Sequence, residues 1–223
     1  MEERVIEASN QHGRFCVPAE SAFTPTAKTI LSGEVHEPDT IALIVERARA
    51  RPGHIVHAGT YFGDFLPALN AAAEYSGRRV YAFEPNDENW LHAVGTVHLN
   101  ELRHTSVQHA ALGEVERTAQ VVVQSGGIAL GGQSRVDQYG DQECTVVPLD
   151  VVLPREESVS VIHLDVECYE EYALAGALAT IGRWRPLLIL ETVPWMWVRE
   201  HLFELGYRGA SGRVHHNTVL EAQ

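Results

Sequence analysis

Cysteine is scarce in this chain of 223 residues. Its three cysteines, Cys16, Cys144 and Cys168, are odd in number, and no two of them have the CxxC spacing of a zinc-binding pair. This usage predicts neither a disulfide framework nor a zinc knuckle. We therefore expect a protein of a reducing compartment, the cytoplasm.

Long apolar runs are lacking as well. No stretch approaches the roughly 18–20 apolar residues that span a bilayer. The opening segment, MEERVIEASNQHGRF, has no apolar core of the kind that a secretory signal requires. We expect neither a membrane segment nor an export signal.

Positive charge is the third shortage. Lysine and arginine number 17 against 30 acidic residues, which gives a formal charge of −13. Nucleic acids and anionic membranes bind clustered basic residues, so neither is an expected partner. A hydrophobic fraction of 45% is typical of a globular protein. The sequence predicts a small-molecule partner and leaves a homodimer open.

Strands and helices alternate along most of the chain. Apolar runs predict strands at 54–58, 78–85, 105–112, 158–167, 185–193 and 216–222, and amphipathic patterns predict helices at 37–53, 63–77, 87–102, 169–182 and 194–207. Strands that are apolar on both faces indicate an α/β fold, a doubly wound and mainly parallel sheet covered on both sides.

Two other segments interrupt this rhythm. The β-rich segments 118–125 and 143–150 enclose the glycine-rich run 126–134, which predicts a small inserted β-hairpin with a mobile loop that acts as a lid. Residues 1–37 show no strong period. We expect them to form an N-terminal segment that caps the pocket of one domain at 38–223.

The stretch VHAGTYFGDF, at 56–65, indicates a ligand-binding turn between a strand and a helix. Gly59 permits a sharp turn, and Gly63 lets the next helix begin close to the sheet. Glu84 ends the following strand about 20 residues later, where adenosine-binding folds place a carboxylate for the ribose hydroxyls. The combination predicts a nucleoside cofactor.

The same turn discriminates between cofactors. A dinucleotide requires a third glycine so that the backbone can approach its pyrophosphate. Here the bulky Tyr61 and Phe62 occupy that position. S-adenosylmethionine carries no phosphate and tolerates such a loop, so the turn favours a methyl donor over nicotinamide cofactors.

Six segments together resemble the FkbM family of S-adenosylmethionine-dependent methyltransferases: HIVHAGTYFGDF, VYAFEPNDEN, HAALG, VPLDVV, VIHLDVECYEEYALAGA and RPLLILE. The likeness covers about residues 33–220. It implies the class I methyltransferase fold, a Rossmann-like sheet of seven strands whose last strand is antiparallel, and methylation of hydroxyl oxygens of small metabolites, sugars or natural-product intermediates.

The resemblance also implies site residues. Gly59, Tyr61 and Gly63 would flank the methionine part of the cofactor, and Glu84 would hold the ribose. The adenine side would be formed by Pro85, Asn86, Ala110 and Ala111. Asp165 and Glu167 match the acids that face the methyl group.

Two positions depart from the family pattern. The family usually has Asp where this chain has His57, and Gly where it has Cys168. A neutral His57 can accept the hydrogen bond that orients the cofactor's ammonium, or it is a hydrogen-bonded strand residue and Asp64 takes over that role. For Cys168 we expect a packing variant with a negative φ.

Methylation of a hydroxyl requires a base near the proton that is lost. Asp165 is the first candidate and His163 the second, since residues two apart share one face of a strand. The alternative for His163 is a hydrogen-bonded interior residue. Mg²⁺ could use Asp165, Glu167 and Glu191 as oxygen ligands, but we do not expect a required metal.

Aromatic residues near the sheet edge suggest an acceptor site. Trp195 and Trp197, with Tyr61 and Phe62, would form an apolar wall over the acceptor, or else pack in the core. Two other functions remain open: a domain that binds S-adenosylmethionine or a partner without catalysis, and a nicotinamide-dependent oxidoreductase.

Overall fold

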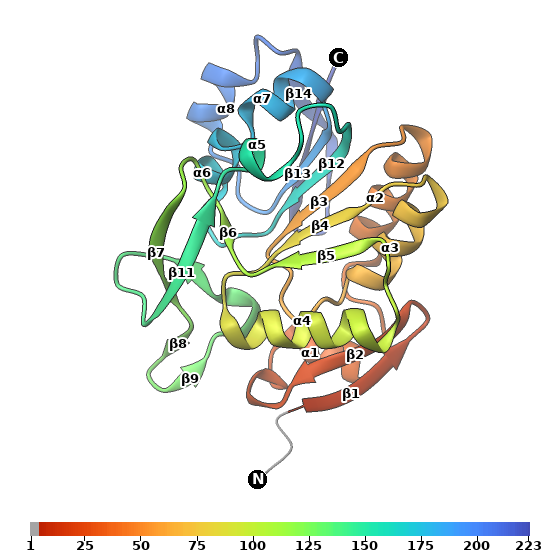
Figure 1. Cartoon of the computed structure of the whole chain (residues 1–223), viewed down its shortest axis with the longest axis vertical. Coiled ribbons are helices and arrows are strands. Elements are labelled where there is room, and N and C mark those ends of the chain that lie inside the picture. Colours follow the sequence, from red (N-terminus) through yellow and green to blue (C-terminus); the bar gives the residue numbers. More distant parts are fainter. Residues whose placement is uncertain (1–4) are drawn as a thin grey trace.

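A sheet of seven strands forms the centre of the computed structural model, which describes residues 5–223 except the side chains of 210–213 (Figure 1). The strand order is β14-β15-β13-β12-β3-β4-β5. Their bounds are His54–Ala58 (β3), Val80–Phe83 (β4), Thr105–Gln108 (β5), Val159–Leu164 (β12), Leu187–Leu190 (β13), Tyr207–Val214 (β14) and Asn217–Ala222 (β15).

The predicted mainly parallel sheet is confirmed. The neighbouring pairs from β5 to β13 are parallel, and β15 runs antiparallel to both β13 and β14. Strand order reverses between β3 and β12, which come from distant parts of the chain. In such sheets ligands bind beyond the carboxyl ends of the strands at this reversal.

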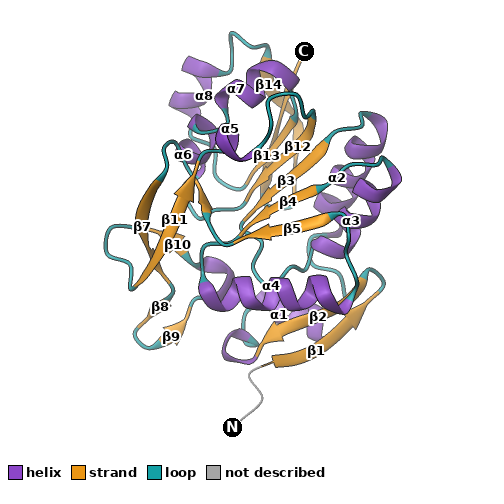
Figure 2. Ribbon diagram, viewed as in Figure 1, coloured by secondary structure: helices purple, strands orange, loops and turns teal. Residues whose placement is uncertain are grey.

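Helices cover both faces (Figure 2). One face packs against α2 (Pro38–Ala50), α3 (Leu66–Tyr75) and α4 (Asp87–Leu99), and the other against α5 (Leu149–Val152), α6 (Glu170–Ala175), α7 (Leu178–Trp184) and α8 (Trp195–His201). Pro38 and Pro67 lie in the first turns of their helices, where a missing N–H costs little.

Three predicted elements have different limits. The strand expected at 105–112 divides into β5 and β6 (Ala111–Leu112), which belong to different sheets. The helix expected at 169–182 divides at Gly176, where a side chain would overlap the backbone of Gly113. The helix expected at 63–77 begins only at Leu66, because Gly63 belongs to the preceding turn.

A smaller sheet stands beside the main one, where the sequence predicts a hairpin. Its order is β10-β7-β11-β6, with β7 (Arg117–Val122), β10 (Arg135–Val136) and β11 (Gln142–Val147). The predicted pair is present as antiparallel β7 and β11. The glycine-rich run between them holds the short strands β8 (Gln124–Ser125) and β9 (Ile128–Ala129) and the 3-10 turn η2 (Gly131–Gln133).

The N-terminal segment is more ordered than its sequence pattern indicates. It forms a hairpin of β1 (Val5–Asn10) and β2 (Gly13–Pro18), then η1 (Ala19–Ser21) and α1 (Pro25–Leu31). The hairpin lies against α4 (Figure 1). Phe15, Val17 and Ile30 pack with Tyr61 and Phe62 of the glycine turn.

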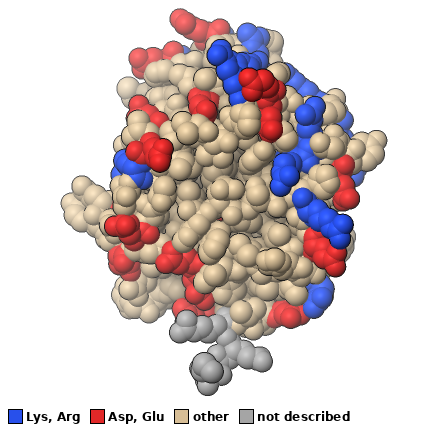
Figure 3. All heavy atoms as spheres, viewed as in Figure 1, with Lys and Arg blue, Asp and Glu red and all other residues tan. Residues whose placement is uncertain are grey.

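The surface and the helices give two further facts. On the face in Figure 3, acidic and basic side chains lie mostly toward the rim. Among the residues that the structure describes, every helix is too short or too polar to cross a lipid bilayer.

Candidate active site

A cavity of about 480 Å³, which we call the acid-rich cavity, lies at the sheet edge. The carboxyl ends of β3, β12 and β13, the N-terminal segment and the loop 125–133 all contribute to it. Five carboxylates and no lysine or arginine appear among its described lining residues. The carboxylates belong to Glu37, Asp64, Asp165, Glu167 and Glu191.

The glycine turn brings the chain against the end of β12. Gly59 has a φ of +84°, and a Cβ there would overlap the carbonyl oxygen of Asp165. Gly63 has a φ of +85°, and a Cβ there would press on Leu66. Glycine is therefore required at 59 by close approach as well as by backbone angle. Tyr61 adopts a φ of +52° between them, without being glycine.

That backbone angle directs the Tyr61 amide at Glu84. The Tyr61 N–H donates to Glu84 Oε2 at 2.8 Å, and the Asn86 N–H donates to Oε1 at 3.0 Å. Asn89 adds a longer hydrogen bond. Burial raises the pKa of Glu84 to about 7, although these three donors favour the carboxylate. The predicted ribose carboxylate is thus held in place by the predicted glycine turn.

The region around Glu84 is narrow. A second cavity of about 20 Å³ is lined by Glu84, Pro85 and Ala111, together with Gly132, Ser134, Arg135 and Val136. Ala110 is buried beside it in the chain. Asn86 caps α4 through its side-chain oxygen and donates to Ser134 Oγ at 2.8 Å. Such a volume holds little more than one water molecule.

His57 and His163 form a buried pair. They lie opposite each other on β3 and β12, with 2.9 Å between their Nδ1 atoms. Phe65 stacks parallel to both rings. Burial lowers the pKa of His57 well below its ordinary value and the pKa of His163 to about 4. Both imidazoles are therefore neutral, and one Nδ1 must donate to the other.

Among the described residues, the outer nitrogens of the pair have no hydrogen-bond partner. Nε2 of His57 and Nε2 of His163 are both buried and unpaired in that part of the chain, as is Asn217 Oδ1. Asn217 Nδ2 donates to Glu37 Oε2 at 2.8 Å. In the tautomer in which His57 Nδ1 donates to His163, His57 presents a lone pair on Nε2.

Three carboxylates gather where β12 and β13 end. Oxygens of Asp165, Glu167 and Glu191 all lie within 4.8 Å of one another. Burial and the nearby charges of Glu191 and Glu167 raise the pKa of Asp165 well above its usual range. Burial and Glu191 also raise the pKa of Glu167. Such a group has a strong affinity for positive charge.

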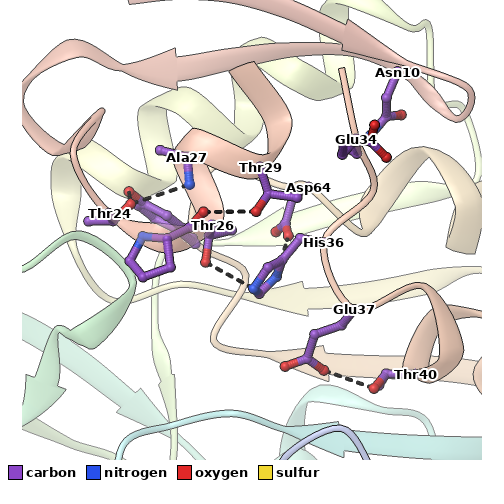
Figure 4. Close-up of polar contacts among 12 residues, drawn as sticks. Asn10, Thr24, Thr26, Ala27, Thr29, Glu34, His36, Glu37, Thr40 and Asp64 are labelled. Atoms are coloured by element: carbon purple, nitrogen blue, oxygen red, sulfur yellow. Dashed lines mark hydrogen bonds and ion pairs between the residues drawn. The ribbon is translucent and has the colours of Figure 1, made fainter. Parts of the chain in front are cut away.

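Asp64 is engaged elsewhere. Its carboxylate lies 3.4 Å from His36 Nδ1, and Thr26 Oγ1 contacts His36 Nε2 at 3.3 Å (Figure 4). Burial lowers the pKa of His36, but Asp64 outweighs it and the net pKa is raised. Figure 4 also shows the hydrogen bond that the Thr40 hydroxyl donates to Glu37 at the start of α2.

The structure corrects two expectations. Cys168 has a φ of +72° and Glu167 a φ of +52°, so Cys168 occupies a left-handed position that favours the family's glycine and is no simple packing variant. The prediction of an apolar wall of four aromatic residues over the acceptor is also wrong. Phe62 is fully buried against the N-terminal segment, and neither Trp195 nor Trp197 lines the acid-rich cavity.

Sequence reasoning missed three residues near the buried pair: His36, Glu37 and Asn217. The motif Glu34-Val35-His36-Glu37 contains ligand-type side chains, but its segment has no period that would place it. The unusual feature of Glu37 is visible only in the structure: its φ is +46° at the position just before α2.

Comparison with known proteins identifies the family of the chain. Residues 57–208 match the model of the methyltransferase FkbM domain. A methyltransferase FkbM structure from Methylobacillus flagellatus KT is 18% identical with a TM-score of 0.51, over 75% of this chain and 42% of that one. The chain thus spans less than half of that protein. A methyltransferase from Geobacter sulfurreducens, also 18% identical, has a TM-score of 0.48 over 84% of this chain and 80% of that one. No curated protein is similar enough in sequence to match.

Proposed function

Because the chain belongs to the FkbM methyltransferase family, we propose that it transfers the methyl group of S-adenosylmethionine to a hydroxyl of a small metabolite, sugar or natural-product intermediate. The observation that carries this proposal is the hydrogen bond from the Tyr61 amide to Glu84, which joins the glycine turn to the ribose carboxylate. The three carboxylates at the ends of β12 and β13 lie on the adjoining cavity wall.

The donor set fits the cofactor. Glu84 Oε1 already accepts from Asn86 and Asn89, while Oε2 accepts only from Tyr61 and can also accept a ribose hydroxyl. Adenosine exceeds the 20 Å³ now enclosed there, so we expect Gly132 and Ser134 to withdraw on binding. The residues proposed to hold the donor are His57, Gly59, Tyr61, Gly63, Glu84, Pro85, Asn86, Ala110, Ala111, Asp165 and Glu167.

The charge of the acid-rich cavity suits the same ligand. S-adenosylmethionine supplies a methyl group already activated on a sulfonium, so the protein has to align the acceptor with it. The carboxylates of this cavity, which no described lysine or arginine lines, would attract the sulfonium and the ammonium. His57, neutral and with Nε2 free, accepts a hydrogen bond from an ammonium without repelling it.

Asp165 remains the first candidate for the base. Burial and the charge of Glu191 raise its pKa, and a cation in the cavity would lower that pKa and favour the ionised form. Asp165 would thus become a base when the donor arrives. His163 is the weaker candidate, since burial lowers its pKa to about 4 and its Nδ1 is occupied.

A metal is not required in this proposal. We expect protonation of Asp165, whose pKa is raised by burial and by Glu191, to relieve the repulsion between these acids without an ion. Turnover is expected to survive EDTA. A loss that Mg²⁺ restores would instead make Asp165, Glu167 and Glu191 metal ligands.

Calorimetry tests the donor site. We expect S-adenosylmethionine and its demethylated product to bind, and NAD to leave the melting temperature unchanged. Glu84→Gln should weaken donor binding about 10- to 100-fold, since it removes a charged acceptor. Because Glu84 has a pKa of about 7, donor affinity should also fall as pH drops below 7 in the native protein and not in the variant.

Exposed Glu116→Gln makes the same charge change away from the site and should alter neither affinity nor pH dependence. Absence of binding at millimolar donor would refute the proposal. Binding without turnover across a broad panel of hydroxyl compounds would favour a non-catalytic cofactor-binding domain.

A further inference from the structure

A second large cleft, of about 530 Å³, lies between the smaller sheet and the turn after β12. We call it the arginine-lined cleft. Its side chains come from β7, β10 and the start of α6 (Figure 2). The residues used below are Arg117, Arg135, Glu167, Cys168, Tyr169 and Tyr172.

The two arginines are available to a ligand. Both are exposed, and within the described part of the chain neither lies within 4 Å of a carboxylate. Arg117 Nη2 donates to the Tyr169 hydroxyl at 2.8 Å, which fixes the direction of its guanidinium. Planar guanidinium groups bind phosphate and carboxylate through paired hydrogen bonds.

The cleft adjoins the site of methyl transfer. Glu167 lines both this cleft and the acid-rich cavity. Arg135 and Tyr169 line both the cleft and the narrow cavity below Glu84. A ligand in the cleft therefore lies beside Glu167, one of the carboxylates after β12.

The turn between the two spaces is strained. Glu167 and Cys168 are consecutive non-glycine residues with positive φ, which costs about 1–3 kcal/mol each. Both side chains line the cleft as a result. Beside them the rings of Tyr169 and Tyr172 are stacked with centroids 4.6 Å apart, and Tyr172 is half exposed. Its open face can pack against a sugar or aromatic ring.

We propose that the arginine-lined cleft binds the methyl acceptor and that the acceptor carries a phosphate or carboxylate group. This inference rests on the proposed methyl transfer. The donor is cationic and suits the acid-rich cavity, which repels anions. An anionic acceptor is drawn to the two arginines, with its hydroxyl directed past Glu167.

Cys168 provides a readout that is independent of activity. It is the exposed cysteine of the three and lies in the cleft, while Cys144 is buried and Cys16 is partly buried. Iodoacetamide is uncharged, and mass spectrometry can follow its reaction with the Cys168 peptide alone. The probes are glucose 6-phosphate, glucuronate and glucose, which share a ring and differ in charge.

At least one charged probe at millimolar concentration should slow the alkylation of Cys168 several-fold, and glucose should not. Which probe protects distinguishes a phosphate from a carboxylate acceptor. In the double variant Arg117→Gln/Arg135→Gln, the concentration for half-maximal protection should rise at least about tenfold. Arg103→Gln, which removes a distant arginine paired with Glu101, should leave it unchanged. Each rate is compared with the same variant without probe.

Any of three results would overturn the proposal of an anionic acceptor. These are protection of Cys168 by glucose as strong as by the charged probes, no protection by any probe, and equal protection in the double variant and the native protein. Calorimetry with the donor product on the same samples separates this failure from failure of the proposed function. If the donor product binds but anionic probes do not protect Cys168, only the proposal of an acceptor site in the cleft is rejected. Absence of donor binding rejects methyl transfer.

Discussion

The acid-rich cavity and the arginine-lined cleft differ in charge and in origin, although they share Glu167. The cavity is built on the ends of parallel strands, and its histidine pair is almost fully buried. The cleft is built largely from the smaller sheet inserted between β5 and β12. Under the two proposals above, the ends of the parallel strands supply the carboxylates and histidines of the donor site, while the smaller sheet supplies the arginines that select the acceptor.

The largest expected effect comes from a substitution that disrupts the acid-rich cavity. Gly59→Ala places a Cβ on the carbonyl oxygen of Asp165 and should reduce folding stability by about 3–5 kcal/mol, with loss of donor binding. Urea unfolding and calorimetry measure both. Gly77→Ala has a similar positive φ but open space, so it should cost about 1 kcal/mol and leave donor binding intact. Equal losses of stability in the two variants would contradict a requirement for glycine from the close approach of Gly59 to Asp165.

An intermediate effect concerns pH and the buried histidines. Both imidazoles have a pKa below the ordinary 6.5, so the unfolded chain takes up protons before the folded one does. The stability that the pair contributes should therefore fall as pH drops from about 6.5 toward 4, by about 3 kcal/mol for His163 alone. Buried carboxylates with raised pKa values, such as Glu84, act in the opposite direction, so the measure is the difference in stability between the native protein and a variant without the pair. The double variant His57→Phe/His163→Phe should flatten this dependence in urea titrations at pH 4.5, 5.5 and 6.5.

Exposed His109→Gln is the matched control and should keep the native slope. Protection of Cys168 by anionic probes should also be unchanged in the double variant, because the pair lies in the cavity and not in the cleft. An undiminished slope would mean that the pair is not neutral in the folded protein.

The smallest effect tests the contact between the cavity and the N-terminal segment. The Tyr61 hydroxyl donates to Ser21 Oγ at 2.6 Å and lies 3.2 Å from Thr24 Oγ1. Tyr61→Phe should cost about 1 kcal/mol of stability, measured by urea unfolding, and keep donor affinity. Tyr139→Phe, at a position 82% exposed, should cost nothing. A larger loss of donor affinity than of stability would give the hydroxyl a binding role.

Much of the sheet could be predicted because local patterns determine it. The apolar runs gave β3, β4, β12 and β13, and Asn86 and the helix-initiating prolines agree with the observed helix starts. The segment of β14, YRGASGRV, was missed because glycines and arginines replace the usual apolar alternation. The N-terminal hairpin was missed because its outer strand is mostly exposed.

The site was predictable where one segment carries it. Gly59, Gly63 and Glu84 can be identified from spacing, and the structure brings the turn and the carboxylate together. The pairing of His57 with His163 depends on the register between β3 and β12, 106 residues apart in the chain. The cleft joins residues from β7, β10 and the turn after β12, which no local pattern connects.

The packing of Tyr61 and Phe62 has a consequence for how this protein can be divided. The family match begins at residue 57, but the rings that support the donor turn are buried against Phe15, Val17 and Ile30. A fragment trimmed to the family boundary would turn that buried face toward water and leave the turn without its backing. The unit of homology is thus smaller than the unit of folding, and any graft of this donor site onto another scaffold must carry the hairpin with it.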